Sequence, residues 1–68
     1  MKVSLKALRV NADMTQNEAA EAIGVTKKTI QNWETYATSP TASQLIRLCS
    51  VYRCGLGDIF LPDKLAES

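Results

Sequence analysis

Apolar residues recur at helical spacing along most of the chain. Leu5 and Leu8 are three apart, and Leu45, Leu48 and Tyr52 follow at steps of three and four. Such spacing places side chains on one face of an α-helix, and no stretch shows the apolar–polar alternation of a strand. The few glycines and prolines fall between the periodic stretches, where helices end. The pattern predicts an all-α fold with short connections.

We expect five helices in a compact, lambda-repressor-like arrangement. They run from about Leu5 to Ala12, from Thr15 to Gly24, onward from Thr26, onward from Pro40, and from Asp58 to Leu61. Capping residues support these starts. Ser4 and Asp58 are expected N-caps. The segments Thr15-Gln16-Asn17-Glu18 and Thr41-Ala42-Ser43-Gln44 are capping boxes, in which two side chains each satisfy an orphan backbone N–H.

The length of 68 residues allows one domain. We expect it to span residues 1–68, with an ordered core at about 4–62 and a frayed tail at 63–68. No stretch is long and apolar enough for a signal peptide or a membrane span, so we expect a soluble, cytoplasmic protein. A chain of this size leaves no room for a ligand-binding domain, and no small-molecule ligand is expected.

Residues for metal or catalytic chemistry are scarce. The chain has no histidine, and Cys49 and Cys54 lack a second ligand pair, so neither a metal site nor a cofactor is expected. We interpret both cysteines as reduced thiols, with Cys49 in the core. No nucleophile stands beside a base, which argues against an enzyme. The net charge of +1 is uninformative by itself.

The segment from Gln16 to Glu34 carries the functional signal. Counting Gln16 as position one, apolar residues occupy positions 4, 8, 10, 15 and 18, with alanine at 5 and glycine at 9. Two helices joined so tightly around Gly24 must cross steeply, with a small residue, Ala20, where they approach. All seven constraints of a helix-turn-helix are met. Trp33 falls on the inner face and is expected in the core.

Motifs beyond this segment extend the similarity. They are Leu8-Arg9, Met14-Thr15-Gln16, Glu18-Ala19-Ala20, Ile23-Gly24-Val25-Thr26, Ile30, Asn32-Trp33-Glu34, Pro40 and Leu45-x-x-Leu48. The chain thereby resembles the Cro/CI, or XRE-type, family of helix-turn-helix regulators, and most of all a small phage or prophage Cro-type repressor. The resemblance covers about Leu5 to Leu61. It implies that the third helix enters the major groove and that a homodimer binds a two-fold-related operator.

Three features depart from the family pattern. Ala19 stands where leucine is commoner, which predicts a slightly underfilled core. Asp13 stands where glycine is common, although aspartate also tolerates the left-handed conformation. The usual glycine shortly after Trp33-Glu34 is replaced by the segment Thr35–Ser39. The sequence therefore does not determine the backbone path of this connection.

The outward face of the third helix is expected to contact bases. Recognition helices direct their N-terminal residues to base edges. Lysine suits guanine O6 and N7, whereas glutamine suits adenine N6 and N7. The expected base contacts are Lys27, Lys28, Thr29, Gln31 and Asn32. A plain solvated face is the alternative for the two lysines, and the surrounding motif favours DNA.

Other polar groups are expected to hold phosphates. Gln16 begins the second helix, whose N-terminal amides suit an anion. A hydroxyl-rich loop follows the third helix, and hydroxyls are frequent phosphate partners. The expected phosphate contacts are Gln16, Thr15, Thr26, Tyr36, Thr38 and Lys6. Arg9 has two open interpretations, a phosphate contact or an ion pair with Glu34, and the family pattern favours the ion pair.

Crowded apolar residues near the C-terminus suggest a dimer interface. Leu56, Ile59, Phe60 and Leu61 are too many for one short helix to bury. The alternative is that Ile59 and Phe60 close the core.

The sequence thus predicts a repressor that binds double-stranded DNA as a homodimer on a near-palindromic operator. An antitoxin that binds a protein toxin and represses its own operon is the alternative. Antitoxins usually have a longer segment for the toxin than the residues that follow Pro62.

Overall fold

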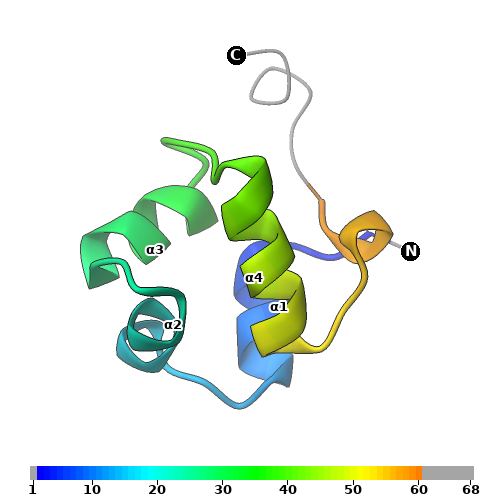
Figure 1. The fold of residues 1–68 in the computed structure, drawn as a ribbon, viewed down its shortest axis with the longest axis horizontal. Helices are drawn as coiled ribbons and strands as arrows, with labels where there is room; N and C mark the ends of the chain where they lie inside the picture. Colours follow the sequence, from blue (N-terminus) through cyan, green and yellow to red (C-terminus); the bar gives the residue numbers. More distant parts are fainter. Residues whose placement is uncertain (1, 61–68) are drawn as a thin grey trace.

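The computed structural model describes residues 2–60, which fold into four α-helices and one short 3-10 helix around a single core (Figure 1). The elements are α1 (Leu5–Asn11), α2 (Gln16–Ile23), α3 (Lys27–Glu34), α4 (Ala42–Tyr52) and the 3-10 helix η1 (Leu56–Asp58). The all-α prediction is confirmed, and the first four predicted helices appear where the caps placed them.

Side-chain caps define the helix starts. The Ala7 amide donates to Ser4 Oγ at 3.1 Å. At α2 the capping box is complete: the Glu18 amide donates to Thr15 Oγ1 at 3.1 Å, and the Thr15 amide donates to Glu18 Oε1 at 2.8 Å. Thr41 and Gln44 form the same reciprocal pair at α4. These bonds satisfy donors that a helix start would otherwise leave unpaired.

A left-handed glycine makes the turn between α2 and α3. Gly24 has φ 86° and donates its amide to the Ala20 carbonyl at 2.8 Å. Arg47 of α4 donates to the Ile23 carbonyl at 3.1 Å, so a cation caps the negative end of α2. The turn is thereby joined to α4 as well as to α3.

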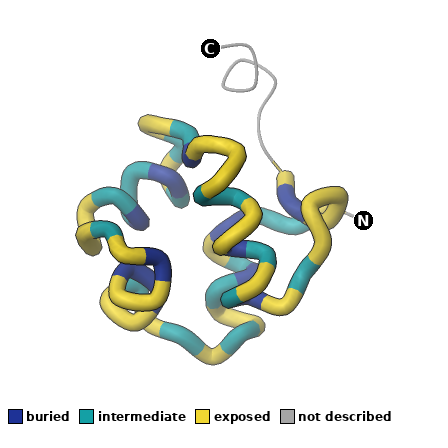
Figure 2. The backbone as a smooth tube through the Cα atoms, viewed as in Figure 1, coloured by how far each residue is buried: buried dark blue, intermediate teal, exposed yellow. Residues whose placement is uncertain are grey.

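Ten apolar residues form the core, and Figure 2 shows that buried positions occur along all four helices. They are Leu5, Leu8, Ala19, Ala20, Ile23, Ile30, Trp33, Leu48, Tyr52 and Ile59. Trp33 is 3% exposed, which confirms it as a core residue. Leu45 and Cys49, predicted inward, are partly buried against this core.

The predicted fifth helix is wrong in kind and position. Instead of an α-helix from Asp58 to Leu61, a single 3-10 turn covers Leu56–Asp58. The backbone after it is extended, because the Phe60 amide donates to the Val3 carbonyl at 2.9 Å and the Val3 amide donates to the Asp58 carbonyl at 2.7 Å. Pairing with the N-terminal segment thus takes the amide that a helix would have used. Leu61 and the predicted tail at 63–68 lie outside the described residues.

Two non-glycine residues take the left-handed conformation at the departures from the family pattern. Asp13 has φ 62°, as expected for an aspartate replacing glycine, and Tyr36 has φ 63°. At Tyr36 the chain leaves α3, and the Ala37 and Thr38 amides both return to the Asn32 carbonyl. The connection is therefore a tight C-terminal turn of the helix.

Within residues 2–60, no helix has the length and apolar character needed to cross a membrane.

Candidate nucleic-acid interface

The surface under consideration is formed by the starts of α2 and α3, on the opposite side of the molecule from the N-terminal segment and η1 (Figure 1). Ile30 and Trp33 anchor α3 to the core, so its other positions face outward. Lys27 and Lys28 are exposed on its first turn, while Gln31 and Asn32 are half-buried one turn later. The helix therefore presents to solvent the polar set that the sequence predicted for base contact.

An ion pair beneath this surface joins α1 to the end of α3. Arg9 Nε donates to Glu34 Oε2 at 2.6 Å and Nη2 donates to Oε1 at 3.2 Å, while Nη1 donates to the Met14 carbonyl at 2.9 Å. The side chains are only 11% and 5% exposed. The hydrogen bond to Glu34 raises the pKa of Arg9 above its ordinary value. The ion-pair interpretation of Arg9 is confirmed, and a guanidinium so occupied is poorly placed for phosphate.

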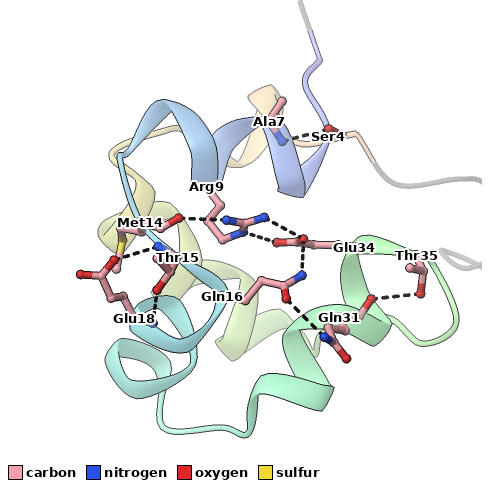
Figure 3. Close-up of polar contacts among 10 residues, drawn as sticks. All are labelled: Ser4, Ala7, Arg9, Met14, Thr15, Gln16, Glu18, Gln31, Glu34 and Thr35. Atoms are coloured by element: carbon pink, nitrogen blue, oxygen red, sulfur yellow. Dashed lines mark hydrogen bonds and ion pairs between the residues drawn. The ribbon is translucent and has the colours of Figure 1, made fainter.

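Glutamine side chains extend this ion pair toward the outer face of α3. Gln16 Nε2 donates to Glu34 Oε1 at 3.1 Å, and Gln31 Nε2 donates to Gln16 Oε1 at 3.3 Å. Figure 3 shows the continuous row of contacts from Arg9 through Glu34 and Gln16 to Gln31. No spacing rule links residues 16 and 31, so their contact was not foreseen from the sequence.

A hollow of about 480 Å³ lies over this row of side chains. It gathers five of the predicted contacts, from α1, α2 and α3: Lys6, Gln16, Lys28, Gln31 and Asn32. Glu34 and Thr35 complete its wall. Within residues 2–60 the only ion pair is the one between Arg9 and Glu34, so the Lys6 and Lys28 ammonium groups have no carboxylate partner in this part of the chain.

Thr26 and Thr29 are engaged with one another. Thr26 Oγ1 accepts from the Thr29 amide at 3.2 Å and lies 2.9 Å from Thr29 Oγ1. Thr15 is likewise occupied in its capping box. These hydroxyls therefore define helix starts, and each still has an exposed side toward solvent at the predicted surface.

In the loop after α3, Thr35 lines the hollow, whereas Tyr36 and Thr38 are not part of its wall. Thr38 is exposed and Tyr36 is half-buried. The Tyr36 ring meets Phe60 edge-on, with ring centroids 6.1 Å apart. The left-handed backbone at Tyr36 thus turns an aromatic side chain toward the C-terminal segment, so of the loop hydroxyls Thr38 is the freer for a phosphate.

The residues of the predicted dimer interface differ in their burial. Ile59 is 5% exposed and belongs to the core, as the alternative interpretation had it, so it cannot offer surface to a partner. Leu56 and Phe60 are 56% and 44% exposed. Leu61 lies outside the described residues. An exposed apolar pair therefore remains beside the bridge between Val3 and Ile59.

A larger hollow, of about 750 Å³, lies between α1 and the end of α4. It contains none of the predicted contact residues. Cys54 lines it, and burial together with the neighbouring Cys49 raises the pKa of the Cys54 thiol to about 11. A thiol with that pKa is protonated at neutral pH and is a weak nucleophile. The smaller hollow, with its unpartnered lysines, is the better candidate for a polyanion.

Comparison with known proteins agrees with this geometry. Residues 5–59 match the family described as helix-turn-helix. The chain is also 30% identical over 64 residues to an uncharacterised HTH-type transcriptional regulator from Archaeoglobus fulgidus, a match that covers 94% of this chain and 90% of that protein.

Proposed function

The chain belongs to the XRE-type helix-turn-helix family of DNA-binding transcriptional regulators, and we propose that it is a repressor that binds a near-palindromic operator as a homodimer. Its α3 enters the major groove and occupies the operator, which excludes polymerase. The observation that carries the proposal is the outward face of α3, where two exposed lysines and two amides lie beside the start of α2.

Different groups on this face have different tasks. The exposed amines of Lys27 and Lys28 match the paired acceptors of guanine, and Gln31 and Asn32 follow one turn along the same helix. Lys6, Thr15, Thr26 and Thr38 are the proposed phosphate contacts. Such contacts set the register of the protein on the duplex without reading its sequence.

Selection from random duplexes tests this proposal. We expect a two-fold-symmetric consensus whose binding weakens steeply as salt rises, because bound lysines displace counterions from DNA. Lys28→Ala and Lys27→Ala should each weaken binding to that consensus roughly tenfold, within the range for one good base contact. Lys2→Ala, the same charge change at the opposite side of the molecule, is the matched control. Unchanged affinity and preference in both α3 variants would refute the assignment of α3.

Dimerisation is the second part of the proposal. One module of this size reads few base pairs, and two-fold pairing doubles the site. The exposed pair Leu56 and Phe60 is the proposed contact between copies. In sedimentation with operator DNA, Phe60→Ser should shift binding from two copies toward one. Val10→Ser is the control, because Val10 has the same 56% exposure as Leu56 but lies on α1. It should leave the number of bound copies unchanged.

A further inference from the structure

The larger hollow, of about 750 Å³, has the size of a small-molecule site, since ligand pockets commonly measure about 300–1,000 Å³. It lies where the C-terminal ends of α1 and α4 meet, toward the bottom of Figure 1. It shares no lining residue with the smaller hollow at the proposed DNA surface, so a molecule bound here would not occupy that surface. A hollow within the domain needs no separate ligand-binding domain, so the small size of the chain does not exclude it.

The floor of the larger hollow is mainly apolar. Leu8 is buried there, and Val3, Met14 and Val51 are half-buried beside it. Such side chains favour the hydrocarbon part of a ligand, because contact with it removes apolar surface from water.

The hydroxyl of Tyr52 is a polar group within this floor. Tyr52 is 5% exposed, and within residues 2–60 its hydroxyl has no hydrogen-bond partner. No unpartnered polar side-chain atom of these residues is sealed from solvent, so the hydroxyl opens into the hollow that Tyr52 lines. Burial raises the pKa of the phenol to about 12, so at neutral pH the group is protonated and can both donate and accept. Buried tyrosine hydroxyls usually have a partner, and here a ligand can supply it.

The rim of the hollow carries its charges. Asp13 and Asp58 contribute two carboxylates and Arg53 one guanidinium, all on exposed residues, which leaves a net charge of −1. Asp58 accepts from the Gly55 amide at 3.0 Å, whereas the Asp13 carboxylate has no hydrogen-bond donor within residues 2–60. The C-terminal ends of α1 and α4 add the negative ends of two helix dipoles. The rim therefore favours a cation.

We propose that the larger hollow binds a small organic amine whose apolar body separates the ammonium group from a second polar atom. The ammonium lies at the rim and donates to the Asp13 carboxylate. The apolar body covers the floor, and the second polar atom pairs with the Tyr52 hydroxyl. This site goes beyond the proposed function, because neither its residues nor its ligand take part in DNA binding.

NMR titration of the full chain with tyramine tests the site. Tyramine has an ammonium group, an aromatic body and a hydroxyl at the far end. It should shift the methyl signals of Met14 and Val51 in a saturable manner at millimolar concentration, as expected for a probe of this size. The methyl signals of Ile46, exposed elsewhere on α4, should stay unchanged. Phenethylamine, which lacks the hydroxyl, should bind roughly two- to tenfold more weakly, the range of one neutral hydrogen bond. Para-hydroxyphenylpropionate, with a carboxylate in place of the ammonium, should bind at least about tenfold more weakly.

Two variants assign the anchors. Tyr52→Phe keeps the ring in the core and should bind tyramine and phenethylamine equally. Asp13→Asn should reduce the preference for tyramine over para-hydroxyphenylpropionate, and asparagine tolerates the left-handed backbone at this position, φ 62°. Glu21→Gln, the same charge change at an exposed position of α2 outside the hollow, is the matched control and should keep both preferences.

The outcomes that overturn the proposal are distinct from those that test DNA binding. Tyramine that shifts no signal of the hollow, or para-hydroxyphenylpropionate that binds as well as tyramine, would overturn the amine site. A tyramine advantage over phenethylamine that persists in Tyr52→Phe would overturn the pairing with the hydroxyl. None of these results depends on whether the protein binds an operator.

Discussion

At the scale of single residues, Glu34 has the most demanding environment. Its side chain is 5% exposed and accepts hydrogen bonds from Arg9 and Gln16. A buried carboxylate is unfavourable unless its oxygens are paired. Arg9 is therefore needed for folding, and the same pairing gives Gln16 its orientation. One ion pair thus connects the stability of the domain to the chemistry of the surface.

Removal of either partner tests this dependence. Arg9→Ala should reduce the free energy of unfolding by about 3–5 kcal/mol, because Glu34 would stay buried without its cation. Urea unfolding measures the change. Glu21→Ala, at an exposed carboxylate of α2, should stay within about 0.5 kcal/mol of wild type. The double variant Arg9→Leu/Glu34→Leu should recover much of the loss. An Arg9→Ala cost similar to that of Glu21→Ala would contradict this account.

The phenol of Tyr52 should make the free energy of unfolding fall at alkaline pH. Burial raises the pKa of its phenol from 10.0 to about 12. The unfolded chain therefore releases the phenol proton first, so the stabilisation is fully present below pH 10 and is lost as pH rises from 10 to 12. A shift of that size corresponds to about 2–3 kcal/mol.

Tyr52→Phe isolates this effect, since it keeps the ring in the core and removes the ionisable group. Denaturant unfolding at several pH values should show a smaller loss between pH 10 and 12 for the variant than for wild type. Equal losses in the two proteins would contradict a raised pKa of Tyr52 as the cause.

At the scale of elements, short polar signals define where each helix begins and turns. The two capping boxes, at Thr15 and Thr41, satisfy backbone donors within the segments themselves. Gly24 reverses the chain between α2 and α3, and this turn sets the angle at which α3 is presented. A change at the turn should therefore affect both stability and the surface.

Two glycine substitutions test this turn. Gly24→Ala should cost about 1–2 kcal/mol, because φ 86° is a left-handed conformation that disfavours a Cβ. Space is not the reason, since the nearest neighbour of that Cβ outside the turn would be Arg47 Nη1 at 4.0 Å. At Gly57 no atom lies within 4 Å and φ is ordinary. Gly57→Ala should thus be neutral or stabilise by up to about 1 kcal/mol. Equal thermal shifts for both variants would refute a backbone cause.

At the scale of the whole molecule, the segments around Val3 and Ile59 close the fold together. Val3 and Ile59 form a parallel bridge, and Ile59 fills the core beneath it. This closure leaves the neighbouring Leu56 and Phe60 outside. Among the described residues of the C-terminal apolar cluster, Ile59 therefore belongs to the core, and Leu56 and Phe60 stay exposed at the proposed contact between copies.

Matched truncations distinguish these tasks. Ile59→Ala should reduce the free energy of unfolding by about 2–5 kcal/mol, as for other buried isoleucines. Leu56→Ala should change the stability of the monomer by less than about 0.5 kcal/mol, because its side chain is largely in solvent. Thermal unfolding at low protein concentration measures both. A larger loss at Leu56 than at Ile59 would contradict the division.

The sequence by itself determined the local features. Capping requires residues at fixed short spacing, so Ser4, Thr15 and Thr41 placed helix starts without knowledge of the fold. Helical periodicity identified Ile30 and Trp33 as core residues. The remaining positions of α3 were therefore expected to face outward. The resemblance also suggested the Arg9–Glu34 ion pair. These are short-range or pattern-level properties, which a linear sequence expresses directly.

Only the tertiary structure decided the rest. Leu56–Asp58 form a 3-10 turn followed by a bridge to Val3, because the Val3 carbonyl accepts the backbone amide of Phe60. The contact between Gln16 and Gln31 depends on the angle at which α2 and α3 cross. Ile59 and Phe60 are adjacent and both apolar, yet one is buried and the other exposed. Side-chain type sets the preference for burial, but the packing of remote elements determines which residue the core has room for.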